Sequence, residues 1–133
     1  MIPILVDTSA ILALRNPRDE VHNDAVAAFG RLKVREVPLL TTNYILVETF
    51  ALLRGRLGQD AVRAFRDQLA PLLDVVWIDQ GIHEEGLDIV VQAGRKGPSL
   101  VDATAFVVAR KRGLTQAFAF DEHYVRAGLG PVP

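Results

Sequence analysis

The segment Ile4-Leu-Val-Asp7-Thr-Ser9 decides the fold, because a short run of β-prone apolar residues stops abruptly at a carboxylate. Three further apolar runs of similar length lie at residues 39–42, 75–78 and 117–120, and the last of them stops at Asp121. Short apolar runs that are bounded by polar or turn residues are typical of buried strands. The sequence therefore predicts four such strands, with Trp77 packed inside the third.

Helical patterns lie between the expected strands. They cover residues 8–14, 19–35, 43–56, 60–73 with an interruption near Pro71, 82–93 and 100–112. Strands that alternate with helices indicate βαβ units and a parallel sheet covered by helices on both faces. We therefore predict an α/β protein, and a further edge strand near Val132 stays open.

Length and composition narrow the class of protein. A chain of 133 residues without repeats or linkers suits one domain, residues 1–133. The absence of cysteine excludes disulfides and thiolate metal sites, and fits a cytoplasmic location. No signal peptide or membrane span is expected, because no uncharged apolar run approaches about 20 residues. The net charge of −1 means that any basic surface for nucleic acid must be local.

Four carboxylates fall where strand ends and first helical turns should meet. Asp7 and Asp121 each follow a predicted strand, and ligands of parallel sheets bind beyond the carboxyl ends of the strands. Asp102 lies in the first turn of the last long helix. Glu48 lies within a strongly apolar helix, where a carboxylate is costly unless it is paired, protonated or bound to a cation.

Helix capping is the competing interpretation for most of these acids. Asp7 and Asp121 could cap helices, and Ser99-x-x-Asp102 resembles a capping box. Glu48 could instead lie on an exposed face. An oxygen-only cluster would suit Mg²⁺ or Mn²⁺, and the bound ion would relieve the repulsion between carboxylates. His123 can be interpreted as a ligand, a proton carrier or an ordinary surface histidine.

Four motifs together resemble the PIN-domain family, and in particular its VapC-type toxins. The motifs are Leu5-Val-Asp7-Thr-Ser-Ala10, Thr42-Asn-Tyr-Ile-Leu-Val-Glu48, Ser99-Leu-Val-Asp102-Ala and Ala119-Phe-Asp121-Glu-His-Tyr124. The resemblance implies a three-layer α/β/α sandwich with a central, mainly parallel sheet of four or five strands. It also implies an endoribonuclease that depends on Mg²⁺ or Mn²⁺, forms a homodimer and is held inactive by a cognate antitoxin.

The resemblance also assigns expected roles to individual residues. Asp7, Glu48, Asp102 and Asp121 take the acidic positions, with Asp7 and Asp102 expected to bind metal directly and the other two partly through water. Further residues match polar positions that can support such a site: Thr8, Ser9, Asn43 and Thr104. Arg15 and Arg18 follow Asp7 closely and are candidate RNA contacts.

Other functions remain open from the sequence. A phosphatase that uses Asp7 as nucleophile is disfavoured, since Ser9 stands where a second acid is commonly needed. A PIN-like nuclease that processes RNA without being a toxin, and a catalytically silent module that binds RNA or protein, are further alternatives. The apolar helices at 44–57 and 62–73 could pack internally or form an interface with an antitoxin or a second subunit.

Overall fold

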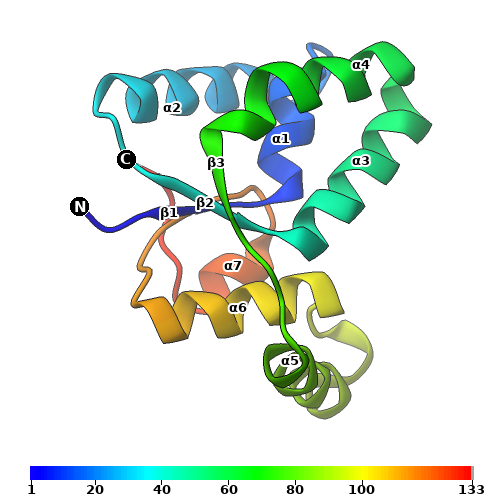
Figure 1. Ribbon diagram of the computed structural model, residues 1–133, viewed down its shortest axis with the longest axis vertical. Helices are drawn as coiled ribbons and strands as arrows, with labels where there is room; N and C mark the ends of the chain where they lie inside the picture. Colours follow the sequence, from blue (N-terminus) through cyan, green and yellow to red (C-terminus); the bar gives the residue numbers. More distant parts are fainter. Residues whose placement is uncertain (133) are drawn as a thin grey trace.

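The computed structural model describes residues 1–132 and forms a parallel α/β fold (Figure 1). The strands are β1 (Ile4–Val6), β2 (Leu39–Thr42), β3 (Leu73–Val76) and β4 (Ala117–Phe118). The helices are α1 (Thr8–Arg15), α2 (His22–Val34), α3 (Asn43–Leu57), α4 (Gln59–Ala64), α5 (Gln80–Ala93), α6 (Leu100–Arg112) and α7 (Glu122–Arg126). Within the described residues, strands and helices alternate as the sequence predicts.

The sheet pairs strands from opposite ends of the chain. Its order is β3-β2-β1-β4, and every neighbouring pair is parallel. Leu5 of β1 is paired with Leu40 on one side and with Ala117 on the other. Because all the strands point the same way, the residues that follow them meet at one edge of the sheet. That edge carries Asp7 and, beyond β4, Asp121.

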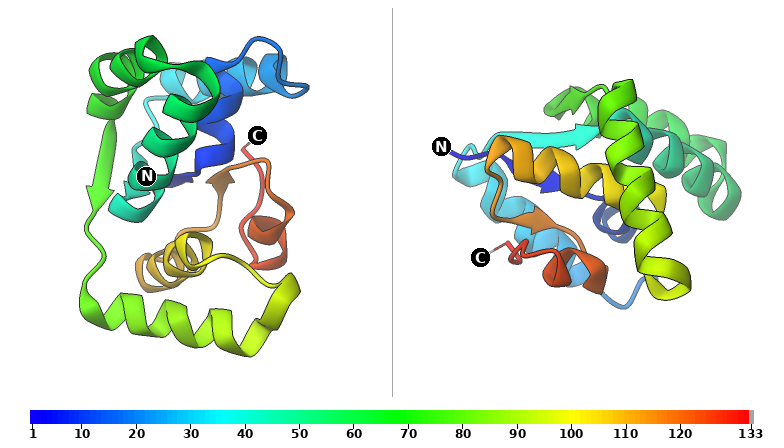
Figure 2. Two further views of the ribbon diagram at one scale, coloured as in Figure 1. Left: turned by 90° about the vertical axis from the view of Figure 1, so that its right-hand side faces the viewer. Right: turned by 90° about the horizontal axis from the view of Figure 1, so that it is seen from below.

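Helices cover both faces of the sheet, so the molecule has three layers. Helices α1 to α4 lie on one face and α5 to α7 on the other, as Figure 1 and the turned views of Figure 2 show. One core lies under α1 and α2, with Ile11 and Leu32 fully buried. The other core lies under α6 and holds Leu5 and Tyr124. The predicted three-layer α/β/α fold with a four-stranded parallel sheet is confirmed.

The third strand lies two residues earlier than predicted. β3 spans Leu73–Val76, and its end, Val76, is paired with Thr42 of β2. Trp77 therefore follows the strand, and its side chain is 73% exposed. The prediction of a core tryptophan was wrong, because an apolar run does not by itself fix where pairing with the neighbouring strand stops.

The segment between α3 and β3 also differs from the prediction, which was a helix at 60–73 interrupted near Pro71. α4 ends at Ala64, a π-helical turn covers Phe65–Leu69, and a 3₁₀ turn at Ala70–Leu72 contains Pro71. Proline cannot donate the backbone hydrogen bond that would continue the helix, so the chain leaves it here and enters β3. Near the end of the chain, the possible extra strand is reduced to one parallel bridge between Gln116 and Gly130.

No helix among residues 1–132 combines the length and apolar character that a membrane crossing requires.

Candidate active site

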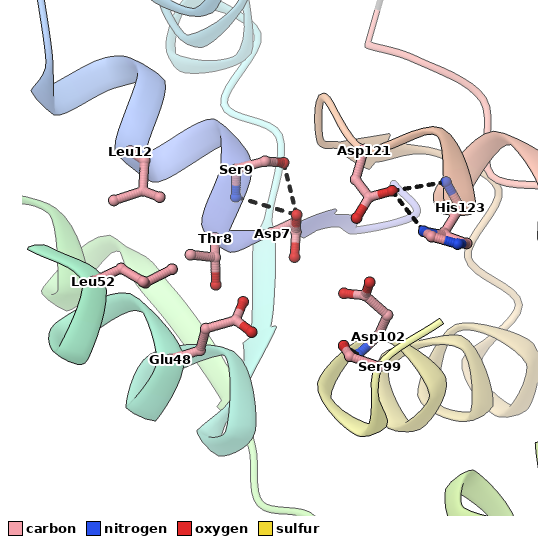
Figure 3. A pocket seen from close by; sticks show the side chains of 10 residues that line it. All are labelled: Asp7, Thr8, Ser9, Leu12, Glu48, Leu52, Ser99, Asp102, Asp121 and His123. Atoms are coloured by element: carbon pink, nitrogen blue, oxygen red, sulfur yellow. Dashed lines mark hydrogen bonds and ion pairs between the residues drawn. The ribbon is translucent and has the colours of Figure 1, made fainter. Parts of the chain in front are cut away.

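The four predicted carboxylates line one pocket at the carboxyl edge of the sheet (Figure 3). The pocket has a volume of about 350 Å³. Asp7 comes from the β1–α1 junction, Glu48 from α3, Asp102 from α6 and Asp121 from the segment before α7. Other residues around it are Thr8, Ser9, Ser99, His123, Leu12 and Leu52. The fold therefore brings together four acids that lie far apart in the sequence.

Asp7 is held in one orientation by three donors. Its Oδ2 accepts hydrogen bonds from the backbone N–H of Ser9 at 3.1 Å and from the Ser9 hydroxyl at 2.7 Å. Its Oδ1 accepts a hydrogen bond from the Tyr124 hydroxyl at 2.8 Å. Asp7 therefore caps α1 and lines the pocket at once, so the capping and site interpretations do not exclude each other.

Ser9 connects the two strand ends that carry Asp7 and Asp121. While its hydroxyl donates to Asp7, the same oxygen accepts the backbone N–H of Phe120 at 2.9 Å. Phe120 directly precedes Asp121, which caps α7 by accepting the backbone N–H of His123 at 2.9 Å. Ser9 thus fixes the spacing between the two loops.

Contacts between α1 and the neighbours of Glu48 on α3 hold Glu48 at the pocket. The Thr8 hydroxyl lies 3.0 Å from that of Thr49 and donates to the carbonyl oxygen of Ile45 at 3.4 Å, which joins α1 to α3. Glu48 lines the pocket, and within residues 1–132 it has no hydrogen-bond or salt-bridge partner. Its carboxylate is thus available to a ligand.

Asp102 carries the clearest electrostatic signature of the cluster. Ser99 caps α6 by accepting the backbone N–H of Asp102 at 3.2 Å, while the Asp102 side chain points into the pocket (Figure 3). Burial, together with the charges of Asp7, Asp121 and Glu48, raises the pKa of Asp102 to about 7. Clustered carboxylates resist ionising together, so Asp102 retains its proton at pH values where an isolated aspartate is ionised.

His123 adds a nitrogen donor to the acidic cluster. Its Nδ1 lies 2.9 Å from Oδ1 of Asp121, and its Nε2 lies 3.2 Å from the carbonyl oxygen of Lys96. The Lys96 carbonyl, together with Asp121, raises the pKa of His123 above its usual value. Asp102, Asp121 and His123 each offer a potential metal-ligand atom, and these atoms lie within 4.8 Å of one another.

The supporting polar residues divide into two groups. Thr8 and Ser9 line the pocket. Asn43 lies outside its lining and accepts the backbone N–H of Ile78 at 2.7 Å, which ties the β3–α5 connection to α3. Thr104 is fully buried, and its hydroxyl donates to two carbonyl oxygens of its own helix at 2.8 and 3.0 Å. Asn43 and Thr104 therefore have structural positions away from the acids.

The two candidate RNA-binding arginines also occupy different places. Arg18 lines a hollow of about 530 Å³ that shares Ser9 and Leu12 with the acidic pocket. Arg15 lines another hollow beside α2, and its Nε is buried without a hydrogen-bond partner among the described residues. Arg18 is thus beside the acids, whereas Arg15 is outside the lining of their pocket.

Tyr124 is a residue of the site for which the sequence analysis predicted no role. It is 1% exposed, and burial raises the pKa of its hydroxyl well above 10.0, with the charges of Asp7 and Asp102 adding to the effect. Its hydroxyl lies between these two acids, 2.8 Å from Asp7 and 3.5 Å from Asp102. Only its position three residues after Asp121 hinted at such a role.

Comparison with known proteins identifies the family. The PIN domain family matches residues 4–129, almost the entire described chain. The chain belongs to the PIN-domain family. Among its relatives, the 23S rRNA-specific endonuclease VapC20 of Mycobacterium tuberculosis, in strains CDC 1551 / Oshkosh and H37Rv, is 36% identical over 128 residues, which cover 95% of each chain.

Solved structures agree with this family assignment. The crystal structure of Mycobacterium tuberculosis VapC20, described as a Sarcin-Ricin loop cleaving toxin, matches with a TM-score of 0.81 and 34% identity, over 95% of each chain. PAE2754 from Pyrobaculum aerophilum matches with a TM-score of 0.66 and 25% identity, over 98% of this chain and 84% of that one. The predicted membership of the PIN-domain family, with VapC-type proteins as its relatives, is confirmed.

Proposed function

We propose that this PIN-domain protein is an endoribonuclease that depends on Mg²⁺ or Mn²⁺ and serves as the toxin of a toxin–antitoxin pair. The observation that carries the proposal is the convergence of Asp7, Glu48, Asp102 and Asp121 on one pocket. Capping uses part of the hydrogen-bonding capacity of two of these acids, but it does not account for Glu48 or for the crowding that raises the pKa of Asp102. The 36% identity to an endonuclease, VapC20, supports the same chemistry.

The pocket fits a hard divalent cation. Its acids supply oxygen donors, the ligand type that Mg²⁺ and Mn²⁺ prefer. The raised pKa of Asp102 reflects first its burial and then a charge repulsion that a cation would relieve. Asp7 and Asp102 would hold the ion most directly, with Glu48 and Asp121 completing its surroundings. When bound, such an ion supplies Lewis acidity toward a phosphate and lowers the pKa of a water.

The chain itself sets how the acids face a substrate. A carboxylate can accept about four hydrogen bonds, and Ser9 and Tyr124 fill three of those positions on Asp7. The remaining position is on Oδ1, the oxygen that shares the Tyr124 hydroxyl with Asp102. Arg18 lies in the adjoining hollow, where its charge would attract the phosphates of an RNA strand toward the acids.

Cleavage of RNA with and without metal tests the proposal. Wild-type protein and Asp102→Asn are incubated with RNA in Mg²⁺, in Mn²⁺ and in chelator, and the new RNA ends are sequenced. We expect wild-type cleavage only with metal, and a loss of at least a hundredfold in Asp102→Asn. Asp88→Asn, on the exposed surface of α5, is the matched control. Full cleavage by Asp102→Asn would refute the assignment, and RNA binding without cleavage by wild type would favour a silent module.

We propose ribosomal RNA of the large subunit as the first substrate to examine. The relative VapC20 is named a 23S rRNA-specific endonuclease, and the crystal structure of VapC20 is described as that of a Sarcin-Ricin loop cleaving toxin. Incubation with total RNA followed by mapping of ends would reveal whether this protein cuts at one place in that RNA. Cuts spread over many unrelated RNAs would argue against a ribosomal target.

We propose that the protein works in the cytoplasm as a homodimer with an antitoxin partner. Large apolar side chains are exposed on α3, after β3 and on α5, at Val47 (70%), Trp77 (73%) and Val91 (77%). Burial of this apolar area in a second copy would be favourable. Light scattering during gel filtration tests the dimer, and a small open reading frame just upstream of the gene would supply the antitoxin for co-purification.

A further inference from the structure

His123 stands apart from the other two histidines of the chain by its surroundings. His22 has its Nδ1 2.7 Å from the carbonyl oxygen of Ala13, and His83 has its Nδ1 2.5 Å from the Tyr44 hydroxyl. His123 alone among the three faces carboxylates, because its Nδ1 is 2.9 Å from Oδ1 of Asp121. Among residues 1–132, the group of His123 with Asp102 and Asp121 is a set of three potential ligands that includes a nitrogen.

The Lys96 carbonyl determines which ring nitrogen carries a proton. A carbonyl oxygen only accepts hydrogen bonds, so the Nε2 that lies 3.2 Å from it must donate its N–H. In the neutral ring, Nδ1 then presents a lone pair to Asp121 Oδ1 at 2.9 Å. Nδ1 is therefore the ring nitrogen that faces the carboxylates of the pocket.

Metal-binding histidines in proteins have this same arrangement. The ring nitrogen that does not bind the metal donates its N–H to a carboxylate or a backbone carbonyl, which fixes the tautomer and the ring orientation. In His123 the carbonyl of Lys96 provides this acceptor, so Nδ1 is directed toward the acids. Glu48 and Asp7, the other two acids of the pocket, have no histidine neighbour among the hydrogen-bonded contacts of the described residues.

We propose that Nδ1 of His123, with one oxygen each from Asp102 and Asp121, forms a mixed position that binds Zn²⁺ or Co²⁺ more tightly than Mg²⁺. Imidazole favours zinc-like transition metals, whereas a site of carboxylates alone favours Mg²⁺. Three protein ligands with an open fourth position are the pattern of catalytic zinc sites. This inference refines the metal chemistry of the proposed active site and rests on that proposal.

The spacing of the three ligand atoms is close to what one ion needs. Ligand atoms about 2.1 Å from one tetrahedral ion are separated by about 3.4 Å. The atoms of Asp102, Asp121 and His123 lie within 4.8 Å of one another, so side-chain movements of about 1 Å or less bring them to this spacing. The His123 and Asp121 side chains are 25% and 34% exposed, which leaves them room for this movement.

Metal titration of the full-length protein tests the mixed site. Calorimetry with Zn²⁺, Co²⁺ and Mg²⁺ compares wild type with His123→Asn, which removes the ring nitrogens. We expect the affinity for Zn²⁺ and Co²⁺ to fall at least tenfold in His123→Asn, while the affinity for Mg²⁺ changes less than threefold. The visible absorption of bound Co²⁺ should also change, and this readout does not depend on catalysis. His83→Asn, the same substitution at the Tyr44 pair, serves as the control.

The outcomes separate this inference from the proposed function. Equal Zn²⁺ and Co²⁺ affinities in wild type and His123→Asn would overturn the mixed site. Loss of all metal binding in His83→Asn would assign the nitrogen to another histidine and also overturn it. The proposed function fails separately, if wild type does not cleave RNA with any metal, whatever the affinities are.

Discussion

Replacement of Asp102 by asparagine should stabilise the metal-free protein while it abolishes cleavage. Burial and the charges of Asp7, Asp121 and Glu48 raise the pKa of Asp102 from 3.8 to about 7. Each pKa unit corresponds to 1.36 kcal/mol, so ionised Asp102 costs the folded state about 4 kcal/mol. Asparagine has nearly the same size and carries no charge, and it should recover about 2–4 kcal/mol of unfolding free energy at pH 8.

The sign of the pH dependence follows from the raised pKa. Below pH 3.8 the carboxyl group is protonated in both the folded and the unfolded chain, so it adds no pH-dependent cost. Between pH 3.8 and about 7 the unfolded chain loses this proton first, and folding stability falls as the pH rises. Above about pH 7 both states are ionised and the cost is complete. The advantage of Asp102→Asn should therefore be small at pH 4 and largest at pH 8.

Urea unfolding in chelator at several pH values measures this difference. With the urea sensitivity usual for a small domain, about 1–3 kcal/mol per M, the midpoint of Asp102→Asn should exceed that of wild type by about 0.7–4 M at pH 8. Asp88→Asn, which removes an exposed carboxylate from α5, should leave the midpoint nearly unchanged. If Asp102→Asn were no more stable than wild type at pH 8, or if its advantage did not grow with pH, the electrostatic account of the cluster would be wrong.

Three further substitutions have defined expectations. Gly86→Ala should cost about 1–3 kcal/mol of unfolding free energy, because a Cβ there would lie 2.6 Å from the side chain of Thr104, which is held by its hydrogen bonds. Gly30→Ala is the control, since a Cβ there has nothing within 4 Å, and it should be neutral or stabilising in thermal melts. Tyr124→Phe should lower the stability by about 1–3 kcal/mol in urea, because Asp7 loses a buried donor; an unchanged midpoint would contradict that. Arg18→Gln should weaken RNA binding at low salt and make the binding less sensitive to salt, as measured by fluorescence anisotropy. Arg35, which does not line this hollow, is the control. An equal effect of Arg35→Gln would mean that Arg18 does not contact the RNA.

The sequence was most informative where the chain leaves a strand. The apolar run that stops at Asp7 and the run that leads to Asp121 both correspond to strands, and parallel pairing puts the two acids at the same edge. Glu48 could be singled out because it is a charge within an apolar helix, and it does line the pocket. These features depend only on neighbouring residues, so they can be predicted from the sequence.

The sequence was least informative where the position of a residue depends on a partner far away in the chain. Trp77 belongs to an apolar run, but the pairing of β3 with β2 ends at Val76 and leaves the indole in solvent. The role of Tyr124 depends on a hydrogen bond to Asp7, 117 residues away. The contact between His123 and the Lys96 carbonyl could not be predicted either, because every residue has a backbone carbonyl.

The pairing of β1 with the edge strand β4 has a consequence for synthesis of the protein. Ser9 is synthesised 111 residues before its partner Phe120, and Asp7 is synthesised 117 residues before its partner Tyr124. A nascent chain that stops before Phe120 lacks Asp121, the backbone donor to Ser9 and the hydroxyl donor to Asp7. The pocket therefore cannot form completely until Tyr124 has been synthesised and β4 has paired with β1.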